Sequence, residues 1–212
     1  MNKHIISCYS VTDAEAKGMT KKDICAKIIR VLSIPPIMIT ALIIMLNVFR
    51  HDIFNHWSDM ILSILFLGII PVLAYPIQIL IPSLKKKGRS EQRKLAFIFS
   101  IAGYSLALIW SIFFNAGKQL ELICATYFIS VLLLTFFNKI IHIRASGHAC
   151  SVTGPLLFLI YFIDWKLCIP CIIFAALIVW SSLYLKRHTK KELAMGSLVC
   201  VIAFLFSLII IY

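Results

Sequence analysis

Charged residues are scarce in this sequence of 212 residues: they make up 14% of it, and only nine are Asp or Glu. A soluble domain typically contains about 25% charged residues. Hydrophobic residues account for 61% of the chain, and its mean hydropathy is +0.95. This composition excludes an ordinary soluble domain and predicts a multi-pass membrane protein with a single domain.

Paired cysteines and clustered carboxylates are also missing. Only Cys168 and Cys171 form a C-x-x-C, and it lies inside an apolar segment without a partner pair. We therefore interpret the cysteines as small packing residues rather than metal ligands or disulfides, and we expect no metal and no cofactor. Ionisable residues are rare at mid-depth of the apolar segments, which argues against a small transporter.

What the sequence does contain is a series of seven apolar segments, at roughly 28–49, 60–83, 95–115, 120–141, 147–163, 167–186 and 193–212. Crossing a bilayer takes about 20 apolar residues. We expect an all-α, polytopic membrane helix bundle with about seven transmembrane helices in residues 27–212, preceded by a polar tail in residues 1–26. Pro35-Pro36 should kink the first span, and Pro71 with Pro76 the second.

Positive charge is concentrated on one side of the predicted bundle. Alternating connections put the N-terminal tail, 84–94, 142–146 and 187–192 on the same side. Eighteen of the 21 Lys and Arg residues belong to this side. The positive-inside rule places such a side in the cytoplasm. A phosphate site would also need cations, so the loop charges are not independent evidence for the orientation. The basic residues of the N-terminal tail are better evidence, and they indicate the same orientation.

Two polar clusters on the basic side suit an anion. The run from Lys85 to Lys94 contains pairs of cations at a fixed distance, which can clamp a phosphoryl group. In Arg144-Ala-Ser-Gly-His148, Gly147 allows the backbone to approach an anion, and the amides of the helix that follows can point at it. Taken alone, the first cluster is also typical of a polybasic loop that binds lipid headgroups, and the second is more typical of a short turn with an interfacial histidine.

A third polar cluster holds His188, with Glu192 four residues later, between the last two apolar segments. On a helix, residues four apart lie on one face. A carboxylate there can hold one imidazole nitrogen while the other attacks an electrophile. Three such clusters at one membrane face predict one assembled site, although this one alone also suits a cytosolic basic loop.

In order and spacing, the clusters resemble the three motifs of the type 2 phosphatidic acid phosphatase (PAP2) superfamily of membrane lipid phosphatases. The family pattern is K-x6-R-P, then P-S-G-H, then S-R-x5-H-x3-D. The residues that match it are Lys86 and Arg93 in the first motif, Ser146, Gly147 and His148 in the second, and Ser181, His188 and Glu192 in the third. The resemblance covers roughly residues 60–205 and implies a core of six helices.

Four positions depart from the family pattern. Lys94 and Ala145 replace the prolines of the first two motifs, and Glu192 replaces an aspartate. Ser182 stands where the third motif has arginine, so one phosphate-binding cation is missing, and Lys186, Arg187 or Arg144 would have to replace it. Two alternatives stay open: a divergent but active enzyme, which the two histidines and the acidic partner favour, and a member that has lost catalysis.

The resemblance implies a metal-independent phosphatase that hydrolyses a phosphomonoester or diphosphate of a lipid, such as phosphatidic acid, phosphatidylglycerol phosphate or polyprenyl diphosphate. His188 would form a phosphohistidine, Glu192 would orient it, and His148 would protonate the leaving alkoxide. The expected phosphate-binding residues are Lys86, Arg93, Arg144, Ser146 and Gly147.

We expect the protein in the cell membrane, with a phosphorylated lipid as its partner and no nucleic acid. The family resemblance implies a site on the outer or lumenal face, whereas the loop charges favour the cytoplasmic face. The alternative function is that of a catalytically impaired membrane protein, which binds anionic lipid or a protein partner through its basic face.

Overall fold

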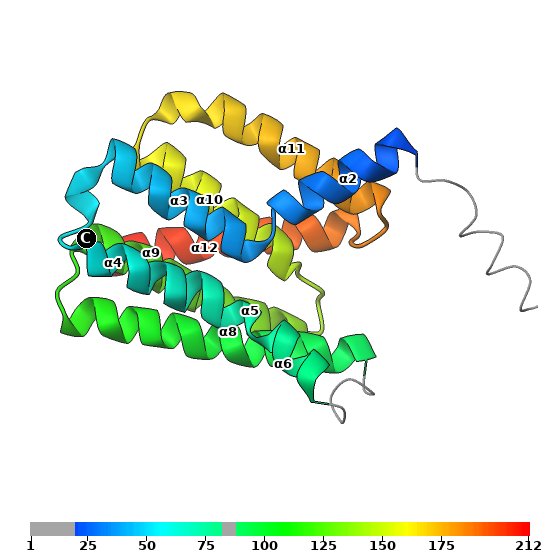
Figure 1. The fold of residues 1–212 in the computed structure, drawn as a ribbon, viewed down its shortest axis with the longest axis horizontal. Coiled ribbons are helices and arrows are strands. Elements are labelled where there is room, and N and C mark those ends of the chain that lie inside the picture. The colour runs from blue at the N-terminus through cyan, green and yellow to red at the C-terminus, as the bar shows by residue number, and fades with distance from the viewer. Residues whose placement is uncertain (1–19, 82–87) are drawn as a thin grey trace, which may run out of the picture.

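The computed structural model describes residues 20–81 and 88–212, and this part of the chain is all-helical (Figure 1). Its α-helices are α2 (Lys21–Leu32), α3 (Pro35–Phe49), α4 (Trp57–Ser63), α5 (Ile70–Val72), α6 (Ala74–Leu80), α8 (Gly88–Phe113), α9 (Lys118–Thr135), α10 (Gly147–Phe162), α11 (Cys168–Tyr184) and α12 (Lys190–Ile211). Two π-helical segments, η2 (Ile64–Ile69) and η3 (Phe136–Ile140), and two short 3-10 helices, η1 (His51–Ile53) and η4 (Trp165–Leu167), complete the set. The expectation of an all-α fold is confirmed for these residues, whereas the six-helix core that the family resemblance implies stays a prediction.

In the described part of the chain, five helical segments are long and apolar enough to cross a membrane: Trp57–Leu80, Lys94–Phe113, Lys118–Ile140, Trp165–Tyr184 and Lys190–Ile211. The bent pair α2 and α3 makes a sixth if the two helices form one span. Helix α10 has 16 residues, fewer than the about 20 that a full span needs. The membrane bundle is therefore supported at five or six spans, and the count of seven stays a prediction.

The proline pair breaks the first apolar segment, as the sequence predicts. Helices α2 and α3 meet at 60°. Ser33 caps the end of α2 and Pro35 opens α3, while Ile34 between them is extended, with ψ of 149°. Proline disfavours a helical conformation in the residue before it, which accounts for the break. The second span, Trp57–Leu80, changes helix type from α4 through η2 to α5 and α6 but forms one helical segment, so its kink at Pro71 and Pro76 stays a prediction.

Helix α2 begins inside the segment that the sequence assigned to the polar tail. Thr20 is its N-cap and forms a capping box with Asp23: the Thr20 hydroxyl accepts from the Asp23 N–H at 3.2 Å, and the carboxylate accepts from the Thr20 N–H at 2.9 Å. Residues 1–19, the rest of the predicted tail, lie outside the described part.

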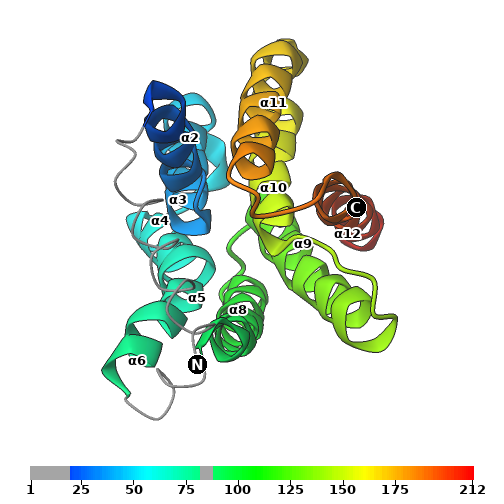
Figure 2. The ribbon, with the colours of Figure 1, turned by 90° about the vertical axis from the view of Figure 1, so that its right-hand side faces the viewer.

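The buried core lies where α3, α9, α10 and α12 meet. Phe158 is fully buried and belongs to one cluster with Leu42, Leu120 and Ile123. Many large apolar side chains instead point outward, among them Ile172 on α11. An outward apolar surface is what helices in contact with lipid need. Seen along the bundle, α2 to α6 lie on one side and α10 to α12 on the other (Figure 2).

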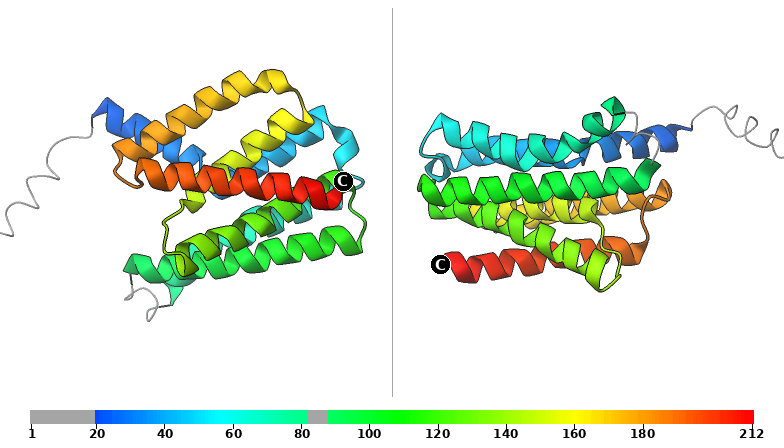
Figure 3. Two further views of the ribbon diagram at one scale, coloured as in Figure 1. Left: turned by 180° about the vertical axis from the view of Figure 1, so that it is seen from behind. Right: turned by 90° about the horizontal axis from the view of Figure 1, so that it is seen from below.

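The connections gather at two ends of the bundle (Figure 3). At one end, the Asn55 side chain donates to the Asn115 carbonyl at 3.3 Å, and the Lys118 ammonium lies 5.6 Å from the centre of the Tyr212 ring. The loops 141–146 and 185–189 lie together at the other end, which we call the basic end. The alternation of connections expected from the sequence is confirmed for these loops.

Candidate active site

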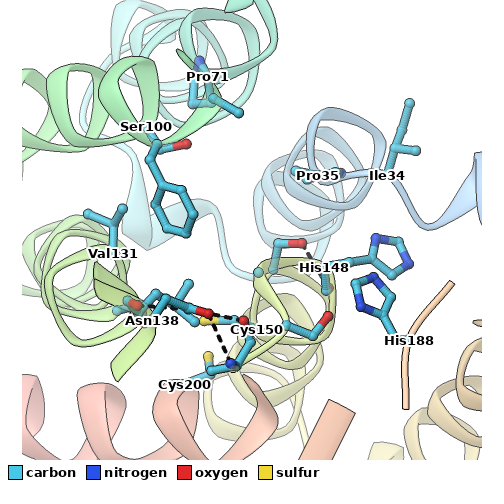
Figure 4. Close-up of a pocket in the computed structure, with 18 of the residues that line it drawn as sticks. Ile34, Pro35, Pro71, Ser100, Val131, Asn138, His148, Cys150, His188 and Cys200 are labelled. Carbon is cyan, nitrogen blue, oxygen red and sulfur yellow. Dashed lines mark hydrogen bonds between the residues drawn. The ribbon is translucent and has the colours of Figure 1, made fainter. Parts of the chain in front are cut away.

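Two histidines face each other at the basic end, beside a cavity in the bundle (Figure 4). His148 lies in the first turn of α10, and His188 lies in the loop between α11 and α12. Their rings are parallel to within 5°, with centroids 6.4 Å apart. The structure thus brings together the two histidines that the sequence singled out.

Glu192 joins the second and third clusters. Its Oε2 lies 3.3 Å from Nδ1 of His188, and its Oε1 lies 3.7 Å from a guanidinium nitrogen of Arg144. Its backbone carbonyl accepts a hydrogen bond from the Ser146 N–H at 2.9 Å. Because the carboxylate binds Nδ1 of His188, Nε2 is the nitrogen that would react with a substrate.

The His188–Glu192 contact does not arise from a shared helix face, and that part of the sequence interpretation is wrong. Helix α11 ends at Tyr184, and α12 begins at Lys190 with Thr189 as its N-cap. Thr189 and Glu192 form a capping box, in which the carboxylate accepts from the Thr189 N–H at 3.2 Å. The capping box turns the carboxylate back toward the loop, where it meets the imidazole.

The second cluster forms the start of α10. Ser146 is the N-cap, and its hydroxyl accepts from the Ala149 N–H at 3.2 Å. Gly147 and His148 occupy the first two positions of the helix, whose amides have no partner within a helix. Amides at a helix N-terminus suit an anion, as the sequence interpretation of this cluster requires.

Asn138, in η3, fixes the loop that leads to Ser146. Its Oδ1 accepts from the Ala145 N–H at 3.1 Å, while its Nδ2 donates to the carbonyls of Ala145 at 3.1 Å and Leu134 at 2.8 Å. A proline at position 145 would have no N–H for this bond. Alanine at this position, where the family pattern has proline, therefore provides a hydrogen bond that proline could not form. A polar residue near the end of an apolar segment was the only sequence signal for Asn138.

Ser33, at the break between α2 and α3, contacts His148. Its Oγ lies 3.2 Å from Nε2 of His148 and donates to the Arg30 carbonyl at 3.1 Å. A hydroxyl has one hydrogen, so the Ser33 oxygen accepts from Nε2–H and the lone pair of a neutral His148 resides on Nδ1. Sequence reasoning missed this residue, because the two positions are 115 residues apart.

The cavity beside the histidines measures about 710 Å³ and extends from the basic end into the bundle. This volume lies within the range of roughly 300–1,000 Å³ that is usual for ligand pockets. Four cations line it, whereas Glu192 is the only acidic residue among the described lining residues. Those cations are Arg30, Arg144, Lys186 and Arg187. An excess of positive charge at one end of the cavity favours an anionic group there.

The first cluster is only partly described. Lys86 lies outside the described residues, and Arg93 belongs to α8, with its side chain also outside the description. Gln92 and Ala96, which flank Arg93 on α8, line the cavity. The N-terminal part of α8 therefore borders the site, while the phosphate-binding roles of Lys86 and Arg93 stay predictions.

Within residues 20–81 and 88–212, no three His, Cys, Asp or Glu side chains lie close enough together to hold a metal ion. The cysteines of this part, including Cys168 and Cys171, are free thiols. The chemistry that the described site offers is that of two imidazoles, one carboxylate and several cations.

Comparison with known proteins gives the chain no relative, so the function has to be argued from the geometry above. No family model, no curated protein and no solved structure matches the sequence.

Proposed function

We propose that the protein is an integral membrane phosphatase that hydrolyses a phosphomonoester or diphosphate of a lipid through a phosphohistidine. The observation that carries this proposal is the pair of parallel histidine rings, whose centroids are 6.4 Å apart, with the Glu192 carboxylate at Nδ1 of His188. The pair lies at the cationic end of a cavity within an apolar bundle. The same activity is the one implied by the resemblance to the PAP2 superfamily.

In the proposed first step, Nε2 of His188 attacks phosphorus and the P–O bond to the lipid breaks. Attack requires the reacting atoms at about 3–3.5 Å, and proton transfer to the leaving oxygen requires about 2.6–3.2 Å. The ring centroids lie 6.4 Å apart, and the proposal places the phosphoryl group between the two reacting nitrogens. Glu192 at Nδ1 orients the ring and stabilises the positive charge that develops on it.

His148 serves as the general acid and then as the general base. Since Nε2 of His148 is bonded to Ser33, proton transfer uses Nδ1: His148 enters the step protonated on both ring nitrogens, passes the Nδ1 proton to the leaving alkoxide and becomes neutral. In the second step, water attacks phosphorus, gives its proton to His148 and breaks the P–N bond. This step releases phosphate and restores His188. Acid–base catalysis of this kind contributes typically about 10²–10⁴-fold.

The phosphoryl oxygens would be held by the cations and amides around the histidines. Arg144 lies at the mouth of the site, with 77% of its side chain exposed, and is kept in place by Glu192. The amides of Gly147 and His148 open α10 and point outward from its N-terminus. Preorganised hydrogen-bond donors stabilise the negative charge that spreads over the phosphoryl group during its transfer.

A lipid substrate fits the position of the site in the bundle. The cavity continues inward from the cations past apolar side chains such as Ile34, Val131 and Leu134. A phosphorylated headgroup can therefore lie at the basic end while an apolar part follows the bundle. Phosphatidic acid, phosphatidylglycerol phosphate and polyprenyl diphosphates are the candidate substrates.

The test is phosphate release by purified protein in detergent, with EDTA present, from a panel of these three lipid classes. We expect release from at least one lipid, no requirement for Mg²⁺, and no release by His188→Ala. His51→Ala, an exposed histidine at the opposite end, is the matched control and should retain activity. No release from any lipid would instead favour a membrane protein that only binds anionic lipid, and a strict Mg²⁺ requirement would indicate different chemistry.

A further inference from the structure

The bent first helix pair reaches into the site. The Ser181 hydroxyl donates to the Ala26 carbonyl at 2.6 Å, and the Tyr184 hydroxyl donates to the Asp23 carboxylate at 3.0 Å. Helix α2 therefore lies against the C-terminal part of α11 (Figure 1). Its own last turn ends at the Ser33 contact with His148, so this turn borders the histidine pair.

Arg30, in that last turn, lines the same cavity as the two histidines. The residue is half-buried, and its Nη1 is fully buried without a hydrogen-bond partner in the described part of the chain. No described carboxylate forms a salt bridge with it. A buried guanidinium nitrogen without a partner costs free energy. Its position beside a cavity therefore favours an anion as its partner.

The charges nearest to Arg30 increase this preference. Arg144 and Arg187 line the cavity as well, so cations repel one another there. The acidic residue of the described lining, Glu192, is already bonded to His188, Arg144 and the Thr189 amide. A phosphoryl dianion between the cations relieves their repulsion and supplies oxygen acceptors for unpaired N–H groups.

We propose that Arg30 binds an equatorial oxygen of the substrate phosphoryl group and supplies the cation that the third motif lacks. Ser182, at the position of the missing arginine, is 1% exposed, and its hydroxyl is buried without a hydrogen-bond partner among the described residues. A planar guanidinium can donate two parallel hydrogen bonds to one phosphoryl group, which a serine cannot. The inference rests on the proposed function for the nature of the substrate.

The test is calorimetric titration of the purified full-length protein with inorganic phosphate in a neutral detergent. Arg30→Met should raise the Kd for phosphate about tenfold or more, and Arg30→Lys should have an intermediate effect. Lys22→Met removes an exposed cation from the same helix and should leave the Kd unchanged. Because Nη1 of Arg30 has no described partner, Arg30→Met should not lower the melting temperature of the phosphate-free protein.

Three results would overturn the inference: no phosphate binding by the wild type, a wild-type Kd in Arg30→Met, or a lower melting temperature of the phosphate-free Arg30→Met variant. The last result would make Arg30 a structural residue. Arg30-dependent phosphate binding by a protein that releases no phosphate from any lipid would support the anion site and contradict the phosphatase. Lipid hydrolysis by Arg30→Met with the KM of the wild type would support the phosphatase and contradict the role of Arg30.

Discussion

At the scale of single residues, Glu192 is the side chain on which the arrangement depends. One carboxylate oxygen meets His188 and the Thr189 amide, and the other meets Arg144. The backbone carbonyl of Glu192 separately holds Ser146. The charge of Glu192 and its structural role can be tested apart, because a glutamine there keeps an acceptor for the Thr189 N–H and leaves the backbone bond to Ser146 in place.

Glu192→Gln should lower kcat by about 10²-fold or more while the protein keeps its fold. The amide can still accept from the Thr189 N–H, and the bond from Ser146 to the backbone is unaffected. It cannot stabilise positive charge on His188 during phosphorylation. Initial rates of phosphate release measure the effect, with Glu121→Gln at the opposite end as the control. A kcat near that of the wild type would contradict the assigned role.

The site residues that the sequence could reveal are those with unusual chemistry and a recognisable spacing. His148, His188 and Glu192 are of this kind, although Glu192 acts through a capping box rather than a helix face. Arg30 and Ser33 could not be found in this way. Their roles depend on the packing of α2 on α11 and on a contact that spans 115 residues, and local spacing carries no information about either.

At the scale of helices, the close approach of α12 to the start of α10 holds the two histidine segments together. Gly196 makes the approach possible, because a Cβ at this position would overlap the Ser146 carbonyl oxygen. The same Cβ would lie 3.1 Å from the Ala149 side chain. Since both neighbours belong to the backbone or a short side chain, they cannot move aside without shifting a helix.

Gly196→Ala should therefore lower the melting temperature in detergent and reduce phosphate release, because α12 carries Glu192 and is forced away from Ser146. Gly154→Ala is the matched control for stability. A Cβ at position 154 meets the Cys200 sulfur at 3.5 Å, which is ordinary contact. Equal melting temperatures for the two variants would show that the contact at Gly196 is not critical.

The helices themselves followed from the sequence more closely than their irregularities did. Long apolar runs set the positions of the spans, and Pro35 set the break in the first one. The π-helical segments η2 and η3 were not foreseen, because a single inserted residue leaves no periodic signal in an apolar run. Neither was the start of α2 at Lys21, which a capping box determines.

At the scale of the whole molecule, the two ends of the bundle differ in charge. The basic end carries the candidate site, and the opposite end joins the loops around Asn55 and Asn115. In the sequence, eighteen of the 21 Lys and Arg residues fall in or next to the tail and loops expected on this side, which the positive-inside rule would place in the cytoplasm. A site on that side would act on lipids of the inner leaflet.

Membrane-impermeant maleimide labelling in intact cells tests this orientation. A cysteine replaces the exposed Lys190 at the basic end or the exposed Lys166 at the opposite end, in a background with Cys8→Ser, Cys25→Ser and Cys168→Ser. We expect Lys166→Cys to react in intact cells and Lys190→Cys to react only after permeabilisation. The reverse pattern would place the site on the outer face, as the family resemblance implies.

The measurement that most directly tests the central claim is the trapping of the phosphorylated enzyme during turnover of a lipid that the release assay identifies. The account predicts an acid-labile, base-stable phosphoryl group on His188, found by mass spectrometry after an alkaline quench and absent from His188→Ala. His148→Gln removes both the general acid and the general base, so it should form this species and hydrolyse it more slowly than the wild type. Turnover with the phosphoryl group on another residue, or with no phosphorylated enzyme in either protein, would contradict the account.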